Sequence, residues 1–247
     1  MFELNSAGGW IVPDRTVIPA STVIPAHSTL GHNCELGSYC TLGNCCTLGN
    51  CCTLGHNCEL GSYCTLGNCC TLGNCCTLGD GCKLGNGCTL GNGCKLGNGC
   101  TLGDYCTLGH NCKLGNYCTL GNNCELGNYC KLGNYCKLGN LGTLGNRGTL
   151  GDYCALGNSC TLGDYCALGN SCALGNSCTW LGVLVTSFIT VSNVDGSSRQ
   201  VKLIKHAQGI KVEAGCFQGS LEKFCAKASA EDKQRYVAVV SAIAGVM

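Results

Sequence analysis

Leucine recurs at every sixth position from Leu30 to Leu174 without a shift of register. Each of these 25 hexads reads Leu-Gly-x-x-Cys-x, with few exceptions. Three earlier hexads, VPDRTV, IPASTV and IPAHST, extend the register back to Val12. A six-residue period is too short for a helical hairpin, so the repeat predicts a stack of short, nearly identical units.

Each hexad is expected to contain one short strand and one bend. The residue between Cys and the next Leu is mostly Thr, Lys, Glu or Ala, so the segment Cys-Thr-Leu alternates in, out, in. The Gly after Leu, followed by Asn, Asp, His or Ser, is typical of a corner, because these residues tolerate unusual backbone conformations. Leu and Cys are therefore the predicted core. Gly142 and Gly148 replace Cys, and we expect thinner packing there.

The pattern resembles the hexapeptide repeat of the left-handed parallel β-helix, as in the trimeric acyltransferase superfamily. The resemblance covers residues 12–179 and includes the aliphatic residue, the Gly after it and the small residue four positions later. It implies a mainly β fold with three hexads per coil and about nine coils, in which residues n and n+18 stack. It also implies a homotrimer. Cysteine at the small inward position departs from the family pattern.

Residues 54–77 repeat residues 30–53 letter for letter. Because a coil holds three hexads, inserting four hexads rotates every later residue by one side of the coil. A site that depended on one special corner would be displaced by this duplication. The copying indicates that length and regularity matter more in this part of the chain than a unique pocket.

The repeat is flanked by two segments of different composition. Residues 1–11, with Phe2 and Trp10, are expected to cap the first coil. Residues 180–247 are expected to form a small α+β module that caps the rod or drives oligomerisation. Within it, WLGVLVTSFITVSNV, RQVKLIKH and GIKVEAG are typical of strands.

Two helices are predicted at the end of this module. The first follows Ser220 as N-cap, and the second, around Tyr236, has Ser229 as a candidate cap. The stretch AGCFQGSLEKF resembles tails on uncharacterised phage and bacterial proteins. That resemblance gives no activity.

The charge and cysteine content limit the classes of partner. Lys plus Arg is 15 and Asp plus Glu is 14, a formal charge of +1 that argues against nucleic acid as a partner. No long apolar run and no basic leader is present, so we expect neither a membrane span nor export. This favours a cytoplasmic location, the host cytoplasm if the protein is phage-encoded. Most of the 29 cysteines are then expected to be reduced and structural, and no cofactor is expected.

Reading the outer positions with a period of three hexads sorts several side chains into columns. Three lysines fall on one side in successive coils and could bind anions, or simply keep the rod soluble. Two corner columns contain tyrosines, and in one of them an arginine falls between two rings. These columns could stabilise the rod or contact a partner. The candidate binding residues are Lys95, Lys113, Lys131, Tyr117, Tyr135, Tyr153 and Arg147.

Four further cysteines each precede an inward cysteine and are expected to point outward or into the corner: Cys45, Cys51, Cys69 and Cys75. Only Cys51 and Cys69 are separated by exactly one predicted coil, and they could form a disulfide or hold a soft metal. The spacing is not that of a zinc motif, so no metal site is predicted.

The sequence contains no recognisable catalytic constellation. His27, His32, His56 and His110 lie at corners, where each fits the turn role of asparagine, and residues 12–179 have no insertion to cover a cofactor. We interpret the chain as a non-catalytic structural or binding protein, a rigid rod that presents flat faces to a protein partner or ligand. Two alternatives stay open: a hexapeptide-repeat acyltransferase, and an oligomer that sequesters small anions beside the lysines.

Overall fold

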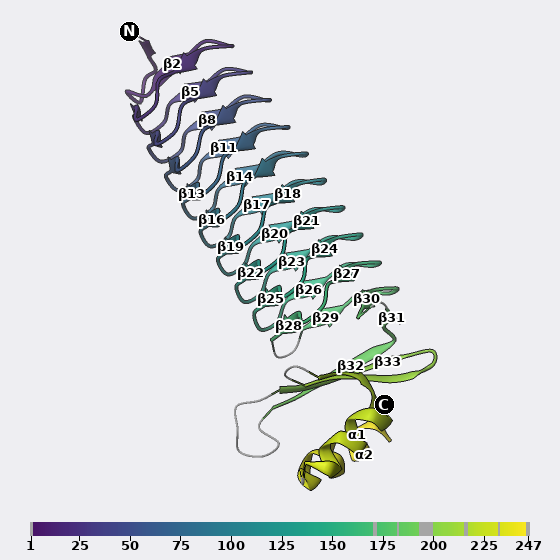
Figure 1. The fold of residues 1–247 in the computed structure, drawn as a ribbon. Coiled ribbons are helices and arrows are strands. Elements are labelled where there is room, and N and C mark those ends of the chain that lie inside the picture. Colours follow the sequence, from purple (N-terminus) through teal and green to yellow (C-terminus); the bar gives the residue numbers. More distant parts are fainter. Residues whose placement is uncertain are drawn as a thin grey trace. The chain divides into compact units, whose positions relative to one another are not determined.

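A computed structural model describes residues 2–169, 172–181, 183–192, 200–214, 217–231 and 233–245. The chain divides into two compact units, Met1–Gly175 and Asn176–Met247. The first unit is a parallel β-helix of about nine coils (Figure 1), which confirms the prediction of a mainly β hexapeptide-repeat fold.

Three sheets of two-residue strands form the walls of the β-helix. The first sheet contains β1 (Glu3–Leu4), β2 (Trp10–Val12), β5 (Thr29–Leu30), β8 (Thr47–Leu48), β11 (Thr65–Leu66), β14 (Lys83–Leu84), β17 (Thr101–Leu102), β20 (Thr119–Leu120), β23 (Lys137–Leu138), β26 (Ala155–Leu156) and β29 (Ala173–Leu174). The second, which we call the lysine sheet, contains β4 (Val23–Ile24), β7 (Thr41–Leu42), β10 (Glu59–Leu60), β13 (Thr77–Leu78), β16 (Lys95–Leu96), β19 (Lys113–Leu114), β22 (Lys131–Leu132), β25 (Thr149–Leu150) and β28 (Ala167–Leu168). The third contains β3 (Val17–Ile18), β6 (Glu35–Leu36), β9 (Thr53–Leu54), β12 (Thr71–Leu72), β15 (Thr89–Leu90), β18 (Thr107–Leu108), β21 (Glu125–Leu126), β24 (Thr143–Leu144) and β27 (Thr161–Leu162).

Strand pairing places residues of successive coils beside each other, three hexads apart. Thr71 pairs with Thr89, and Leu72 pairs with Leu90, in parallel register. The leucines point inward and are buried, whereas the residue before each leucine faces outward. The register confirms the prediction of three hexads per coil.

Glycine at the corners has a different role from the one that the sequence suggested. Positive φ angles occur at the fourth position of the hexad, as in Asn33 (56°) and Leu141 (57°), rather than at the glycine in the second position. A Cβ added to Gly97, a second-position glycine, would lie 2.7 Å from the backbone nitrogen of Asp80. Glycine is therefore required at the second position because successive coils approach closely there.

Asparagine at the third position links successive coils. The Oδ1 atom of Asn50 accepts a hydrogen bond of 2.8 Å from the backbone N–H of Asn68, whose own Oδ1 accepts from Asn86 N–H at 2.8 Å. The repeat of this contact along the corners explains why Asn, Asp, Ser and His alternate at this position, since each has an acceptor atom at a suitable distance.

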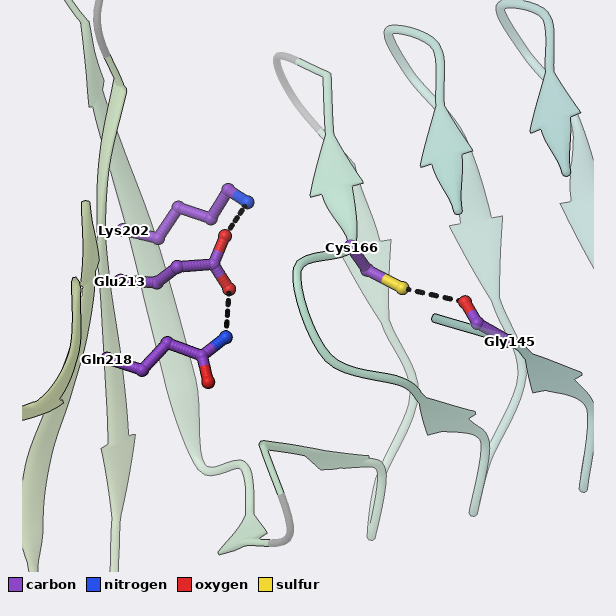
Figure 2. A network of polar contacts seen from close by, with 5 residues as sticks. All are labelled: Gly145, Cys166, Lys202, Glu213 and Gln218. Carbon is purple, nitrogen blue, oxygen red and sulfur yellow. Dashed lines mark hydrogen bonds and ion pairs between the residues drawn. The ribbon is translucent and has the colours of Figure 1, made fainter. Parts of the chain in front are cut away.

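The inward cysteines form a second hydrogen-bonded ladder. The Sγ of Cys166 donates to the carbonyl of Gly145 at 3.2 Å (Figure 2), and Cys94 donates to the carbonyl of Gly73 at 3.3 Å. The neighbouring thiol of Cys112, together with burial, raises the pKa of Cys94 to about 11. The Cys94 thiol is thus protonated at neutral pH and acts as a buried structural group, because the thiolate is the reactive form.

Gly142 and Gly148, which replace inward cysteines, do not thin the core as expected. A Cβ added to Gly142 would lie 2.5 Å from Cγ of Leu138, and one added to Gly148 would lie 2.5 Å from Cγ of Leu144. The neighbouring leucines therefore occupy the space that a cysteine side chain would need.

An antiparallel strand covers the outer edge of β2. Strand β1 pairs with β2 through Leu4 and Trp10, and the rings of Phe2 and Trp10 lie 5.3 Å apart. Between the strands, Oδ1 of Asn5 accepts hydrogen bonds from the backbone N–H groups of Ala7 and Gly9 at 2.9 and 3.0 Å. Because β1 runs against β2, the parallel stack does not continue past β2 in the first sheet.

The second unit combines an antiparallel sheet with two helices. Its strands are the pair β30 (Thr179–Trp180) and β31 (Val183–Leu184), and the sheet β32 (Ser187–Ser192), β33 (Gln200–His206), β34 (Gly209–Ala214) and β35 (Phe217–Ser220). Its helices are α1 (Leu221–Ala230) and α2 (Gln234–Ala244).

The helix caps are only partly as predicted. The Ser220 hydroxyl caps α1 by accepting from the backbone N–H of Lys223 at 3.3 Å. The expectation for Ser229 was wrong: this residue lies within α1, and Lys233 precedes α2 with no side-chain cap. The two helices and the sheet share a core that includes Val212, Phe224 and Val240.

A buried ion pair lies in this second unit. Lys202 and Glu213 are in contact through Nζ and Oε1, and Glu213 Oε2 accepts a hydrogen bond of 3.5 Å from Gln218 (Figure 2). The Nζ atom of Lys202 also lies 5.4 Å from the centre of the buried Trp180 ring.

Neither α1 nor α2, nor any other helix in the described part of the chain, is long and apolar enough to span a membrane.

Candidate binding surface

Three predicted binding residues lie side by side on the lysine sheet. Lys95 pairs with Lys113, and Lys113 pairs with Lys131, so the three side chains project outward from neighbouring coils. Neighbouring strands are about 4.8 Å apart, which brings like charges close together. Within the described residues none of the three forms an ion pair, so their charges remain available to an anionic group.

The tyrosine column, formed by Tyr117, Tyr135 and Tyr153, lies on the corner that follows the lysine sheet, after β19, β22 and β25. Successive ring centroids lie 5.0 Å apart with interplanar angles of 3° and 7°, so the rings are stacked in parallel. All three side chains are exposed. Stacking covers the ring faces inside the column and leaves edges and hydroxyl groups exposed.

The arginine column, formed by Tyr129, Arg147 and Tyr165, lies on the corner that precedes the lysine sheet, before β22, β25 and β28. The guanidinium carbon of Arg147 lies 5.6 Å from the centre of the Tyr129 ring and 5.7 Å from that of Tyr165. Its Nη1 also donates to the Tyr129 hydroxyl at 3.2 Å. These contacts hold the charge of Arg147 at a defined place on the corner.

The three groups border one face of the rod. Strand β22 illustrates this: Tyr129 lies in the turn before Lys131, and Tyr135 lies in the turn after it. At Lys131 the sheet is therefore flanked by aromatic side chains on both corners. Lys113 has an aromatic neighbour only on the following corner, and both corners beside Lys95 hold glycine. Sequence reasoning identified each column separately but did not place the columns around one face. Tyr129 and Tyr165, the two rings that the sequence period placed on either side of Arg147, belong to this surface as well.

The third corner carries the two cysteines for which a disulfide was expected. Cys51 and Cys69 are both exposed free thiols at the fourth position of neighbouring coils, with φ angles of 59° and 58°. Their pairing stays a prediction. No group of three or more His, Cys, Asp or Glu side chains in the described ranges could hold a metal ion.

Three corner histidines take the place of asparagine in the inter-coil ladder. The Nδ1 atoms of His32, His56 and His110 each accept a backbone N–H at 2.8 Å, from residues 50, 74 and 128. An imidazole that accepts at Nδ1 holds its proton at Nε2 when neutral. In this state neither ring nitrogen offers a free lone pair, so the arrangement is unsuited to a general base.

The comparison with protein families agrees with the repeat. Residues 70–110 and 105–140 match the family described as "Bacterial transferase hexapeptide (six repeats)". The comparisons with curated proteins and with solved structures give no match.

Proposed function

Because the chain is a hexapeptide-repeat β-helix protein, we propose that its rod is a non-catalytic binding module and that the lysine sheet is its binding face. The observation that carries this proposal is the register of Lys95, Lys113 and Lys131 in successive coils, on a sheet whose two aromatic corner columns meet at Lys131. On the first and third sheets, the outward residues are mostly threonine, and the charged residues do not follow one another in successive coils.

The chemistry of this face favours an acidic protein surface as partner. Like charges on adjacent strands destabilise a sheet, and carboxylates placed over them would relieve the repulsion. Exposed tyrosine hydroxyls at the edges can donate further hydrogen bonds to such groups. Tyrosine and arginine are also enriched in protein interfaces, where their rings provide contact area at little conformational cost.

A defined acidic polymer tests the binding face. We expect poly-L-glutamate to bind the full-length protein, with an affinity that falls as salt is added. Replacing Lys95, Lys113 and Lys131 with alanine should lower that affinity at least 10-fold. The matched control is the double alanine variant of Lys83 and Lys137, whose side chains lie on the first sheet and are not in neighbouring coils.

Two outcomes would overturn the proposed partner. An equal loss of poly-L-glutamate affinity per lysine removed in the triple variant and in the control would mean that only overall charge matters. Tight binding of citrate that competes fully with poly-L-glutamate would favour the alternative in which the protein sequesters small anions.

Acyl transfer is the second candidate function, and the family name is the observation that favours it. Against it stands the engagement of Nδ1 in His32, His56 and His110. We expect no turnover of acyl-CoA with amine or hydroxyl acceptors. Turnover that is lost in a His110→Asn variant, which keeps the ladder acceptor, would overturn the non-catalytic proposal.

Assembly as a homotrimer belongs to the same proposal, since hexapeptide-repeat proteins often form trimers. Light scattering on the reduced full-length protein should give three times the chain mass of 25.5 kDa. A monomeric mass would remove the trimer from the proposal without affecting the binding face.

A further inference from the structure

Cys51 and Cys69 are related by one coil of the rod. Their backbone N–H groups donate to the carbonyls of Asn68 and Asn86 at 2.9 and 2.8 Å, and their φ angles are nearly equal, 59° against 58°. Their side chains therefore leave the corner in the same direction, one strand spacing apart.

The duplicated segment is the origin of this pair. Cys69 is the copy of Cys45, which lies on a different corner from Cys51. The insertion of four hexads rotates the copy by one side, and this rotation places Cys69 directly next to Cys51 along the rod. Cys45 and Cys75, in contrast, are each the single thiol on their part of a corner, because their neighbours one coil away are His27, Tyr63, Asn57 and Gly93.

The parallel register disfavours a disulfide between these thiols. A disulfide needs a Cβ–Cβ distance of about 3.8 Å, whereas parallel residues on adjacent strands are about 4.8 Å apart. Closing this gap would compress the corner by about 1 Å. The inter-coil ladder opposes the compression, because Asn50 Oδ1 already accepts from Asn68 N–H at 2.8 Å on the same corner.

The same separation fits two metal–sulfur bonds placed end to end. A thiolate binds a metal such as zinc at about 2.3 Å, so one ion between two sulfurs spans about 4.6 Å. A Cβ on Gly87 would lie 3.5 Å from the Cys69 sulfur, which shows that a fourth-position thiol leans along the rod toward the next coil. With no third ligand in the described residues, the pair suits an ion that accepts two thiolates, as soft Cu(I) does, and not tetrahedral Zn²⁺.

We propose that Cys51 and Cys69 form a two-coordinate site for a soft, thiol-binding monovalent cation of the Cu(I) class. Each thiol loses its proton on binding, so one ion replaces two protons. The site does not depend on the lysine sheet or on any partner bound there.

The test uses the reduced full-length protein, titrated anaerobically with Cu(I) against a chromogenic Cu(I) chelator. We expect one tightly bound equivalent, and Cu(I) should protect Cys51 and Cys69 from alkylation, as mapped by mass spectrometry, while Cys45 and Cys75 react. Cys51→Ser and Cys69→Ser should each weaken binding at least 10-fold. Cys45→Ser and Cys75→Ser should leave it unchanged.

A gain-of-site variant completes the test. Asn57→Cys places a second thiol one coil before Cys75, so the variant should bind a second equivalent of Cu(I). Three results would overturn the proposal: no protection of Cys51 and Cys69 by Cu(I), a Cys51–Cys69 disulfide that forms in air and is unaffected by Cu(I), or a folded Asn57→Cys protein that binds only one equivalent.

Discussion

The imidazole Nδ1 of His56 accepts a hydrogen bond from the backbone N–H of Asn74, one coil later, at 2.8 Å. This contact is the one that Oδ1 of Asn50 makes to Asn68 at the same length. His56→Asn should therefore keep the acceptor and leave the free energy of unfolding within about 0.5 kcal/mol of the wild type. His56→Ala removes the acceptor and should cost about 1 kcal/mol.

Urea denaturation followed by far-UV circular dichroism separates these two variants. His27→Ala is a suitable control, because His27 occupies the fourth position of its corner rather than the third, and its backbone carbonyl, not its ring, accepts from Asn5. If His56→Asn were as destabilised as His56→Ala, the histidine would have a role other than that of an asparagine substitute.

Alanine substitutions at two glycines of one corner should destabilise the rod for different reasons. Gly99 has a φ of +66° and no atom within 4 Å of an added Cβ, so Gly99→Ala should cost only the left-handed strain, about 1 kcal/mol. Gly97 lies where an added Cβ would come within 2.7 Å of backbone atoms of the preceding coil, and Gly97→Ala should cost about 3 kcal/mol. Equal losses in thermal melts of the two variants would contradict the division of roles between the two corner positions.

The sequence was sufficient to predict the stacking register of the coils, but not the backbone conformation at their corners. A leucine at every sixth position with glycine beside it leaves few ways to bury one face, so the stacking of residues n and n+18 could be derived. The left-handed residues could not be identified, because Tyr117, Cys51 and Leu141 rarely adopt positive φ and only the stacked coils impose it. Strand β35 was missed because FQGS shows no apolar alternation.

The candidate site was predictable to a similar degree. A period of three hexads was enough to group Lys95 with Lys113 and to place Arg147 between two rings. That two corner columns border one sheet follows only when the order of strand and corner around the coil is considered together. No sequence pattern indicated the buried Lys202–Glu213 pair, since its residues are 11 positions apart on strands whose register depends on the turn between them.

The Cys94 and Cys88 thiols should make the rod less stable at alkaline pH. The folded pKa of Cys94 is about 11, above the ordinary value of 9.0, because of the neighbouring Cys112 thiol and burial; Cys88 is raised to about 11 in the same way by Cys106. A folded state that holds its proton more tightly loses stability as pH rises from about 9 through about 11, and below pH 9 this contribution is fully present. Circular dichroism should show the loss of stability, and alkylation mapped by mass spectrometry should label Cys94 and Cys88 only as the rod unfolds. Alkylation of these two thiols well before unfolding would contradict the prediction.

The buried pair in the second unit predicts a non-additive response to mutation. Lys202 and Glu213 have exposed fractions of only 5% and 6%, and Gln218 donates to the second carboxylate oxygen. Glu213→Ala should destabilise this unit by about 3–5 kcal/mol, because it removes the carboxylate that neutralises the buried Lys202 ammonium. The double variant Lys202→Met/Glu213→Leu replaces both charges with apolar groups of similar size and should lie within about 1 kcal/mol of the wild type. Thermal unfolding of α1 and α2, followed by helical circular dichroism, measures both. A double variant that is as unstable as Glu213→Ala would show that the ion pair contributes more than mutual neutralisation.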